Sequence, residues 1–143
     1  MPLTRKRIIY DRSGENPYMI RHHLIFREKS EHLEKNVSVP FNAYIHKILL
    51  SDEPILHDHP WNWGTFIISG GYWEHTPEGT FWRGPGSWRT QKSTDLHWLE
   101  LNENKPCYTL FWHGARSRIW GFQTDDGWTD YRTFLQNRLE SRT

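Results

Sequence analysis

The segment His57-Asp58-His59, followed by Pro60-Trp61, carries the residues whose types and spacing could do chemistry. Residues two apart in an extended strand face the same side, so we expect His57 and His59 to present their imidazoles side by side. Neutral imidazole is a ligand that first-row divalent metals favour. Asp58 would face the opposite side, where we expect it to hydrogen-bond a backbone or a neighbouring strand. The pair predicts two ligands of one metal site.

A third ligand must come from another part of the chain, and His97, within residues 95–101, is the best placed candidate. Three neutral imidazoles leave a divalent ion its full charge and open coordination positions. Fe(II) in such a site could bind a substrate donor and O₂ together. Zn(II) would polarise a carbonyl or generate bound hydroxide. Imidazole suits several metals, so ligand type alone leaves Fe, Zn, Mn and Ni open.

Composition predicts one domain spanning residues 1–143, with a core over 37–123. The net charge of +1 and the pI near 8.0 lack the basic footprint of a nucleic-acid-binding protein. The single cysteine, Cys107, excludes an intrachain disulfide and is expected to be a small core residue. Without the apolar stretch of a signal peptide or a membrane span, the sequence predicts a cytoplasmic protein with no membrane partner.

Short β-type runs separated by turn residues are typical of an all-β sandwich or barrel. We expect a Gly70-Gly71 turn to join 65–68 and 72–75 as a hairpin, and 95–101 to pair with 106–113. The segment 27–36 is expected to be an exposed loop or a single helical turn. From Thr129 the spacing fits a helix over 129–139, capped by Thr129 and packed outside the barrel. The strands are predicted within 4–26 (chiefly 18–26), and at 41–50, 55–63, 65–68, 72–75, 79–83, 95–101, 106–113 and 118–123.

The order His57-x-His59, Gly70-Gly71, Pro85-Gly86-Ser87 and His97 resembles the two-motif signature of the cupin superfamily, over residues 40–122. The resemblance implies a double-stranded β-helix, or jelly-roll barrel, with one metal ion in its bore. A cupin motif usually also has a glutamate a few residues after its second histidine. Residues 61–65 contain no carboxylate, and Glu74 is too far along the chain for that position.

This departure is similar to the three-histidine subgroup that includes the thiol dioxygenases, such as cysteine dioxygenase. That likeness implies a mononuclear non-haem Fe(II) dioxygenase. The sequence His-Asp-His-Pro-Trp at 57–61, together with residues 118–122, also resembles a group of bacterial and phage cupins without known activity. Gly64 stands where some thiol dioxygenases carry a crosslinking cysteine, and no arginine upstream of His57 matches their carboxylate clamp. The substrate is therefore not expected to be free cysteine.

Further residues are candidates for catalysis. His113 lies near where thiol dioxygenases carry a tyrosine, which suggests a proton shuttle, although an exposed loop histidine fits better. His46 could line the bore or satisfy neighbouring polar atoms.

Other residues are candidates for substrate binding. Arg83 ends a predicted strand before a Gly-Pro-Gly turn and could clamp an anionic substrate. Tyr44, Trp63 and Tyr108 are the expected aromatic contacts, while most of the nine tryptophans should simply fill the barrel.

Three functions remain open from sequence. The first is an Fe(II) dioxygenase acting on a small aromatic or thiol-bearing molecule. The second is a metal-dependent isomerase or hydrolase of a sugar-like or nucleotide-like substrate. The third is a non-catalytic barrel that sequesters a small molecule. Exposed sheet edges would favour a homodimer in each case.

Overall fold

A computed structural model of the chain describes residues 6–11, 13–24 and 41–141. The loop predicted at 27–36 lies outside these residues. Among the described residues the regular elements are β-strands, apart from one 3₁₀ turn (η1) and one α-helix. In chain order the elements are β1 (Lys6–Tyr10), β2 (Pro17–His23), β3 (Phe41–Ile48), β4 (Trp63–Ser69), β5 (Tyr72–Thr76), β6 (Gly79–Arg83), β7 (Trp88–Gln91), β8 (Trp98–Leu101), η1 (Asn102–Asn104), β9 (Cys107–Gly114), β10 (Gly121–Thr124), β11 (Gly127–Asp130) and α2 (Tyr131–Ser141).

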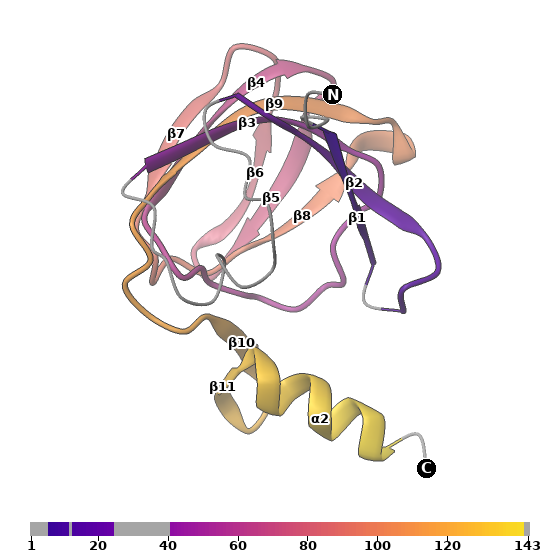
Figure 1. Ribbon diagram of the computed structural model, residues 1–143, viewed down its shortest axis with the longest axis vertical. Helices are drawn as coiled ribbons and strands as arrows, with labels where there is room; N and C mark the ends of the chain where they lie inside the picture. The colour runs from indigo at the N-terminus through magenta and orange to yellow at the C-terminus, as the bar shows by residue number, and fades with distance from the viewer. Residues whose placement is uncertain (1–5, 12, 25–40, 142–143) are drawn as a thin grey trace, which may run out of the picture.

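The described strands form three antiparallel sheets. A six-stranded sheet has the order β1-β2-β3-β9-β4-β7, a three-stranded sheet the order β6-β5-β8, and β10 pairs with β11. The two larger sheets together make a barrel-like body, and the β10–β11 hairpin and α2 are set off at one end (Figure 1).

Two predicted strand pairings are wrong. β4 pairs with β7 and β9, whereas β5 pairs with β6 and β8. Gly70-Gly71 therefore carries the chain from one sheet to the other instead of closing a hairpin. Gly70 has φ +87°, and a Cβ there would lie 2.5 Å from the Pro106 carbonyl oxygen. In the same way β8 pairs with β5, and β9 lies between β3 and β4.

The strand predicted at 55–63 is also wrong. In this stretch only His57 makes β-bridges, to His97 and Phe122, and β4 begins at Trp63. The backbone is nevertheless held by neighbouring segments on each side. The N–H of Asp58 donates to the carbonyl oxygen of Gly121, and the N–H of His59 donates to the carbonyl oxygen of Ser93, each at 3.0 Å. The expected same-side placement of His57 and His59 therefore survives without a regular strand.

The barrel interior changes from apolar at one end to polar and aromatic at the other. Ile48, Ile67 and Cys107 pack with Tyr72 and Leu101 as a buried cluster, which confirms Cys107 as a core residue. Further along the same strands the inward positions become histidine, tyrosine and tryptophan. In β3, for example, Ile48 is followed inward by His46, Tyr44 and Asn42, all buried. One end of the barrel is thus a packed core and the other can hold a site.

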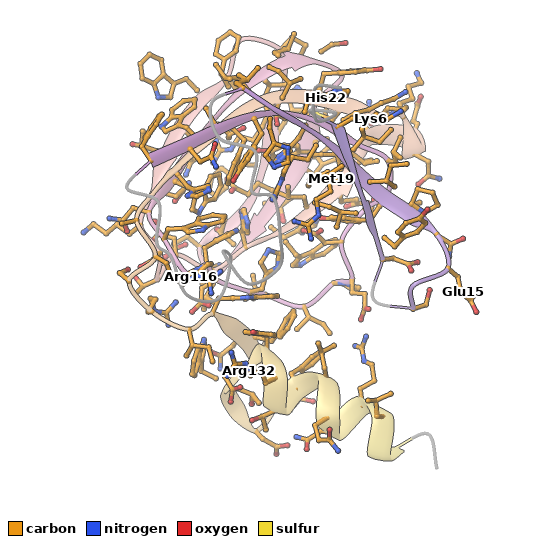
Figure 2. All side chains as sticks on the ribbon, in the orientation of Figure 1. Lys6, Glu15, Met19, His22, Arg116 and Arg132 are labelled. Atoms are coloured by element: carbon orange, nitrogen blue, oxygen red, sulfur yellow. The ribbon has the colours of Figure 1, made fainter. Side chains whose placement is uncertain are left out.

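The C-terminal helix packs against the β10–β11 hairpin. Its first turn is capped by Asp130, whose two carboxylate oxygens accept the N–H and the hydroxyl of Thr133 at 3.1 and 2.7 Å; the predicted cap at Thr129 is one residue early. Phe134 stacks on Phe122 with ring centroids 4.2 Å apart. Figure 2 shows side chains crowding the barrel interior and a separate group around α2, near Arg132. None of the described helices has the length and apolar character that a bilayer crossing needs.

Candidate metal centre

Three histidines from two separate segments converge at the polar end of the barrel. His57, His59 and His97 each offer a ring nitrogen, and these atoms all lie within 4.8 Å of one another. Three nitrogen ligands about 2.1 Å from one tetrahedral ion would be about 3.4 Å apart, so the 4.8 Å limit is about 1.4 Å wider than a closed site. His97 is buried and the other two are partly buried. The structure therefore brings together all three histidines proposed from sequence; their function as ligands stays a prediction.

The chemistry of this cluster fits a divalent metal. Burial, together with the nearby His97 and His57, holds the pKa of His59 well below its ordinary value of 6.5, so this imidazole stays neutral and able to coordinate. Nδ1 of His59 is buried without a hydrogen-bond partner among the described residues. Buried polar atoms are normally satisfied, so this nitrogen is consistent with a missing bound group.

Asp58 and Arg118 fix the backbone that carries the pair. Asp58 is buried and points away from the imidazoles, as predicted, and it accepts the N–H of Gly121 at 2.7 Å and the indole N–H of Trp128 at 2.8 Å. Arg118 lies 2.8 Å from the Asp58 carboxylate and also donates to the carbonyl oxygen of His59 at 3.2 Å. The aspartate is thus a structural residue between two histidines.

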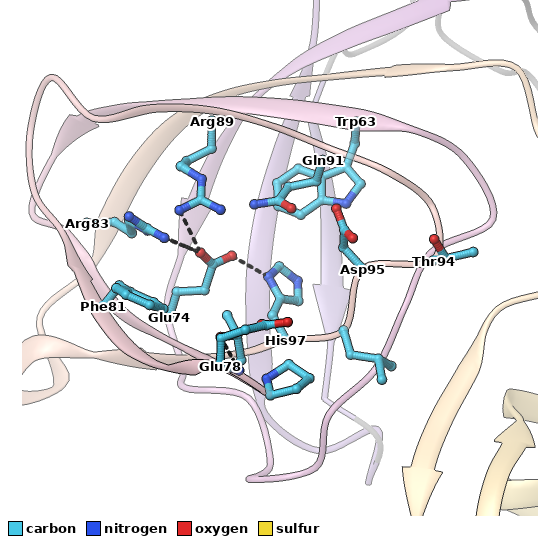
Figure 3. A pocket seen from close by; sticks show the side chains of 13 residues that line it. Trp63, Glu74, Glu78, Phe81, Arg83, Arg89, Gln91, Thr94, Asp95 and His97 are labelled. Carbon is cyan, nitrogen blue, oxygen red and sulfur yellow. Dashed lines mark hydrogen bonds and ion pairs between the residues drawn. The ribbon is translucent and has the colours of Figure 1, made fainter.

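A second network lies behind His97 (Figure 3). Glu74, only 2% exposed, accepts a hydrogen bond from Nδ1 of His97 at 2.7 Å and one from Nε of Arg83 at 3.1 Å. Burial raises the pKa of Glu74, but the His97 hydrogen bond and the Arg83 charge together bring it below its usual value. Arg83, proposed from sequence as an anion clamp, is therefore engaged by a carboxylate of the protein itself.

A cavity of about 780 Å³ opens beside the three histidines. Trp61 stacks on His113 with centroids 4.3 Å apart and planes within 11°, and it also stacks on His59 at 5.5 Å. Trp63 and Phe111 stack at 5.5 Å. These rings form a continuous aromatic wall from the histidine cluster into the cavity. Trp63, which the sequence offered as a substrate contact, is part of this wall.

Polar residues line the same cavity beyond the aromatic wall. His113 is buried, not an exposed loop residue; its Nδ1 lies 2.8 Å from the Gly114 carbonyl oxygen and its Nε2 lies 2.9 Å from the Tyr44 hydroxyl. His46 is also buried, and its Nε2 accepts a hydrogen bond from Nε of Arg21 at 3.0 Å. Burial first, then the charge of Arg21, holds the pKa of His46 well below 6.5.

Two expectations about neighbouring positions need correction. Tyr108 lies on the outer face of β9, 37% exposed, and lines neither cavity, so the structure does not bring it to the site. Arg21 was missed, although it is an arginine upstream of His57 in the cavity wall. The sequence signal for Arg21 was the alternation of β2, which turns Met19, Arg21 and His23 to one side and packs Met19 on the core.

At Gly64 a Cβ would lie 2.3 Å from the Trp112 indole, so a cysteine does not fit there without moving that ring.

Comparison with known proteins gives matches in structure. No protein-family model and no curated protein sequence matches the chain. An RmlC-like cupin from Ralstonia eutropha is 9% identical, with 95% of this chain and 81% of that one covered and a TM-score of 0.56. A protein with a double-stranded β-helix domain from Klebsiella pneumoniae is 14% identical, with 76% and 86% covered and a TM-score of 0.52. HppE in its Fe(II) form is 11% identical, with 76% and 56% covered and a TM-score of 0.54.

At these identities the likeness concerns the fold. The two larger antiparallel sheets of this chain are the arrangement expected of a double-stranded β-helix, which is the fold of these similar structures. The predicted fold class is thereby confirmed: the chain has the double-stranded β-helix, or jelly-roll, fold of RmlC-like cupins, with a short C-terminal helix.

Proposed function

We propose that this protein is a mononuclear metal enzyme that holds Fe(II) with His57, His59 and His97 and acts as a dioxygenase on a small ring-bearing molecule. The observation that carries the proposal is the convergence of three imidazole nitrogens within 4.8 Å at the wall of a large cavity. When bound, Fe(II) would supply open positions at which a substrate donor and O₂ can meet. The Fe(II) form of HppE has the same fold, so the fold is compatible with this metal.

The aromatic wall supports a flat substrate. Trp61, Trp63 and Phe111 present ring faces and edges between the histidine cluster and the polar end of the cavity. Offset stacking on such rings would orient a planar molecule, and the apolar surface would keep water away from its reacting edge. A cavity of about 780 Å³ is large enough for a molecule of one or two rings.

Tyr44 and His113 are the proposed proton-handling pair. The Gly114 carbonyl can only accept, so Nδ1 of His113 carries the proton and Nε2 accepts from the Tyr44 hydroxyl. Tyr44 would then accept a proton from the substrate, while its own hydroxyl proton passes through the hydrogen bond to Nε2 of His113. Nε2 of His46 accepts from Arg21, which leaves the His46 proton on Nδ1 and makes this residue a neutral member of the cavity wall.

Anaerobic purification, loading with Fe(II) and measurement of oxygen uptake over a panel of ring-bearing and thiol-bearing metabolites would test the proposal. We expect stoichiometric iron and uptake with at least one ring-bearing compound. Turnover under argon with zinc or manganese would instead identify an isomerase or hydrolase. Tight ligand binding that a chelator leaves unchanged, without any turnover, would identify a non-catalytic barrel; either result overturns the dioxygenase proposal.

A further inference from the structure

A second cavity, of about 490 Å³, shares His97 and Trp63 in its lining with the large one. Two arginines line it, Arg83 and Arg89, but so do three carboxylates, of Glu74, Glu78 and Asp95. The acidic groups outnumber the basic ones, so this cavity is not built to capture an anion. Both arginines lie close to the Glu74 carboxylate, as Figure 3 shows. Their charges therefore act on Glu74.

We propose that Glu74 is a positioning residue, which fixes His97 in the tautomer protonated at Nδ1 and so presents Nε2, with its lone pair, to His57 and His59. The consequence for metal binding rests on the proposed function above. The assignment of the His97 tautomer is independent of that function, and it can be tested on protein without metal.

Each oxygen of the Glu74 carboxylate has its own task. Oε2 lies 2.7 Å from Nδ1 of His97, and Oε1 lies 3.1 Å from both Nε and Nη2 of Arg83. Nη1 of Arg89 follows at 3.7 Å from Oε1. An ionised carboxylate can only accept, and a neutral imidazole has a single N–H. The proton of His97 must therefore lie on Nδ1, which leaves Nε2 as the nitrogen that can coordinate.

The strand register explains why this contact is made. Glu74 and Tyr72 alternate inward on β5, and Glu74 pairs with Leu99 of β8. His97 directly precedes β8, so its ring reaches the Glu74 carboxylate across the strand pair. A buried carboxylate is costly unless paired, and Arg83, whose side chain is 17% exposed, supplies the compensating charge. Hydrogen bonds of this kind to the second nitrogen of a coordinating histidine fix the ring and raise its basicity.

The substitution Glu74→Gln tests the inference sharply. Arg83 can only donate, so the amide oxygen of Gln must face Arg83 and its NH₂ must face Nδ1 of His97. Nδ1 would then have to accept, and the proton would move to Nε2, the nitrogen needed for the metal. Glu78→Gln is the matched control, because Glu78 is an exposed carboxylate of the same cavity.

Two measurements on the full chain test whether Glu74 fixes the His97 tautomer. Long-range ¹H–¹⁵N correlation spectra of the metal-free protein, with the His97 signals assigned by their loss in His97→Gln, should show Nδ1–H in the wild type and in Glu78→Gln, and Nε2–H in Glu74→Gln. Zn²⁺ affinity, measured by competition with a chromophoric chelator, should fall about 10–100-fold in Glu74→Gln only.

The outcomes separate the inference from the proposed function. A wild-type His97 protonated at Nε2 overturns the inference, even if Glu74→Gln fails to fold. Unchanged Zn²⁺ affinity in a folded Glu74→Gln overturns the positioning of the ligand. A wild type that shows Nδ1–H but binds no divalent metal contradicts the proposed function, while the Glu74–His97 tautomer stands.

Discussion

His57 and His97 exchange two backbone hydrogen bonds, since the N–H of each donates to the carbonyl oxygen of the other at 3.0 Å. Residues that exchange both bonds in an antiparallel pair project their side chains on one face, and here the two imidazole centroids are 4.9 Å apart. Neither residue belongs to a regular strand. The short bridge therefore holds the two halves of the candidate metal centre in place before anything binds.

Removing any of the three clustered imidazoles should empty the proposed site. We expect His57→Ala, His59→Ala and His97→Ala to lose most of the metal found in wild-type protein purified without added metal, because two ligands hold a divalent ion far more weakly than three. His75→Ala is the control, since His75 lies on the outer face of β5 and bonds Glu100. Elemental analysis gives the answer, and unchanged occupancy in His57→Ala and His97→Ala would show the ligand assignment to be wrong.

Stability should fall as the pH decreases through the range where histidine normally titrates. The pKa of buried His46 is held well below 6.5 by burial and by Arg21, His23, His113 and His22. Below pH 6.5 the unfolded chain therefore binds a proton that the folded chain refuses. The free energy of unfolding should then drop by about 1.4 kcal/mol per pH unit for this group.

The variant His46→Gln isolates that contribution. Its amide oxygen can still accept from Arg21, but it cannot titrate. Urea denaturation at several pH values between 7.5 and 5 should give a shallower slope for the variant. The slope should not vanish, because the pKa of His113 is lowered too, mainly by burial. Parallel slopes for the two proteins would contradict the assignment.

The sequence was sufficient for features that depend on local spacing. Neighbours in the chain determine the i, i+2 relation of His57 and His59, the outward turn of Asp58 and the change to helical spacing near residue 130. They do not determine which strands pair with one another. The Gly70-Gly71 pair reads as a hairpin turn, yet β4 finds its partners in β7 and β9, because the jelly roll alternates between two sheets. Only long-range packing decides between those partners.

The rest of the site was hidden for a similar reason. The burial of His113 and its bond to Tyr44 depend on the β3–β9 register, which pairs Tyr44 with Phe111 and Asn42 with His113. Glu74 could have been suspected, since a glutamate on the inward face of a strand must have a partner. That its partner is His97 follows only from the pairing of β5 with β8.

Asp58 should be among the residues on which stability most depends. Asp58→Ala would leave a buried backbone N–H at Gly121 and the Trp128 indole without their acceptor, and would remove the charge that faces Arg118. Because the Arg118 side chain is 28% exposed, we expect the lower end of the usual range for a broken buried pair, about 3 kcal/mol of unfolding free energy. Asp126→Ala, at an exposed position of the neighbouring turn, should be nearly neutral in the same denaturation experiment. Equal effects of the two substitutions would show that Asp58 does not hold the segment.

Tyr44 and Tyr108 offer a matched pair for the proposed proton transfer, since they lie on neighbouring strands but on opposite faces of the same sheet. Tyr44→Phe removes the hydroxyl that donates to His113, whereas Tyr108→Phe changes only the exposed surface. With the iron-loaded protein and a substrate found in the oxygen-uptake panel, kcat should fall roughly 100-fold in Tyr44→Phe if Tyr44 takes a proton from the substrate and passes its own to His113. Iron content should be unchanged, because Tyr44 is not a ligand, and the unpaired His113 nitrogen should cost about 1 kcal/mol of stability. Tyr108→Phe should match the wild type in all three measurements. A Tyr44→Phe variant with wild-type kcat would leave Tyr44 and His113 as wall residues and would require another group for the proton.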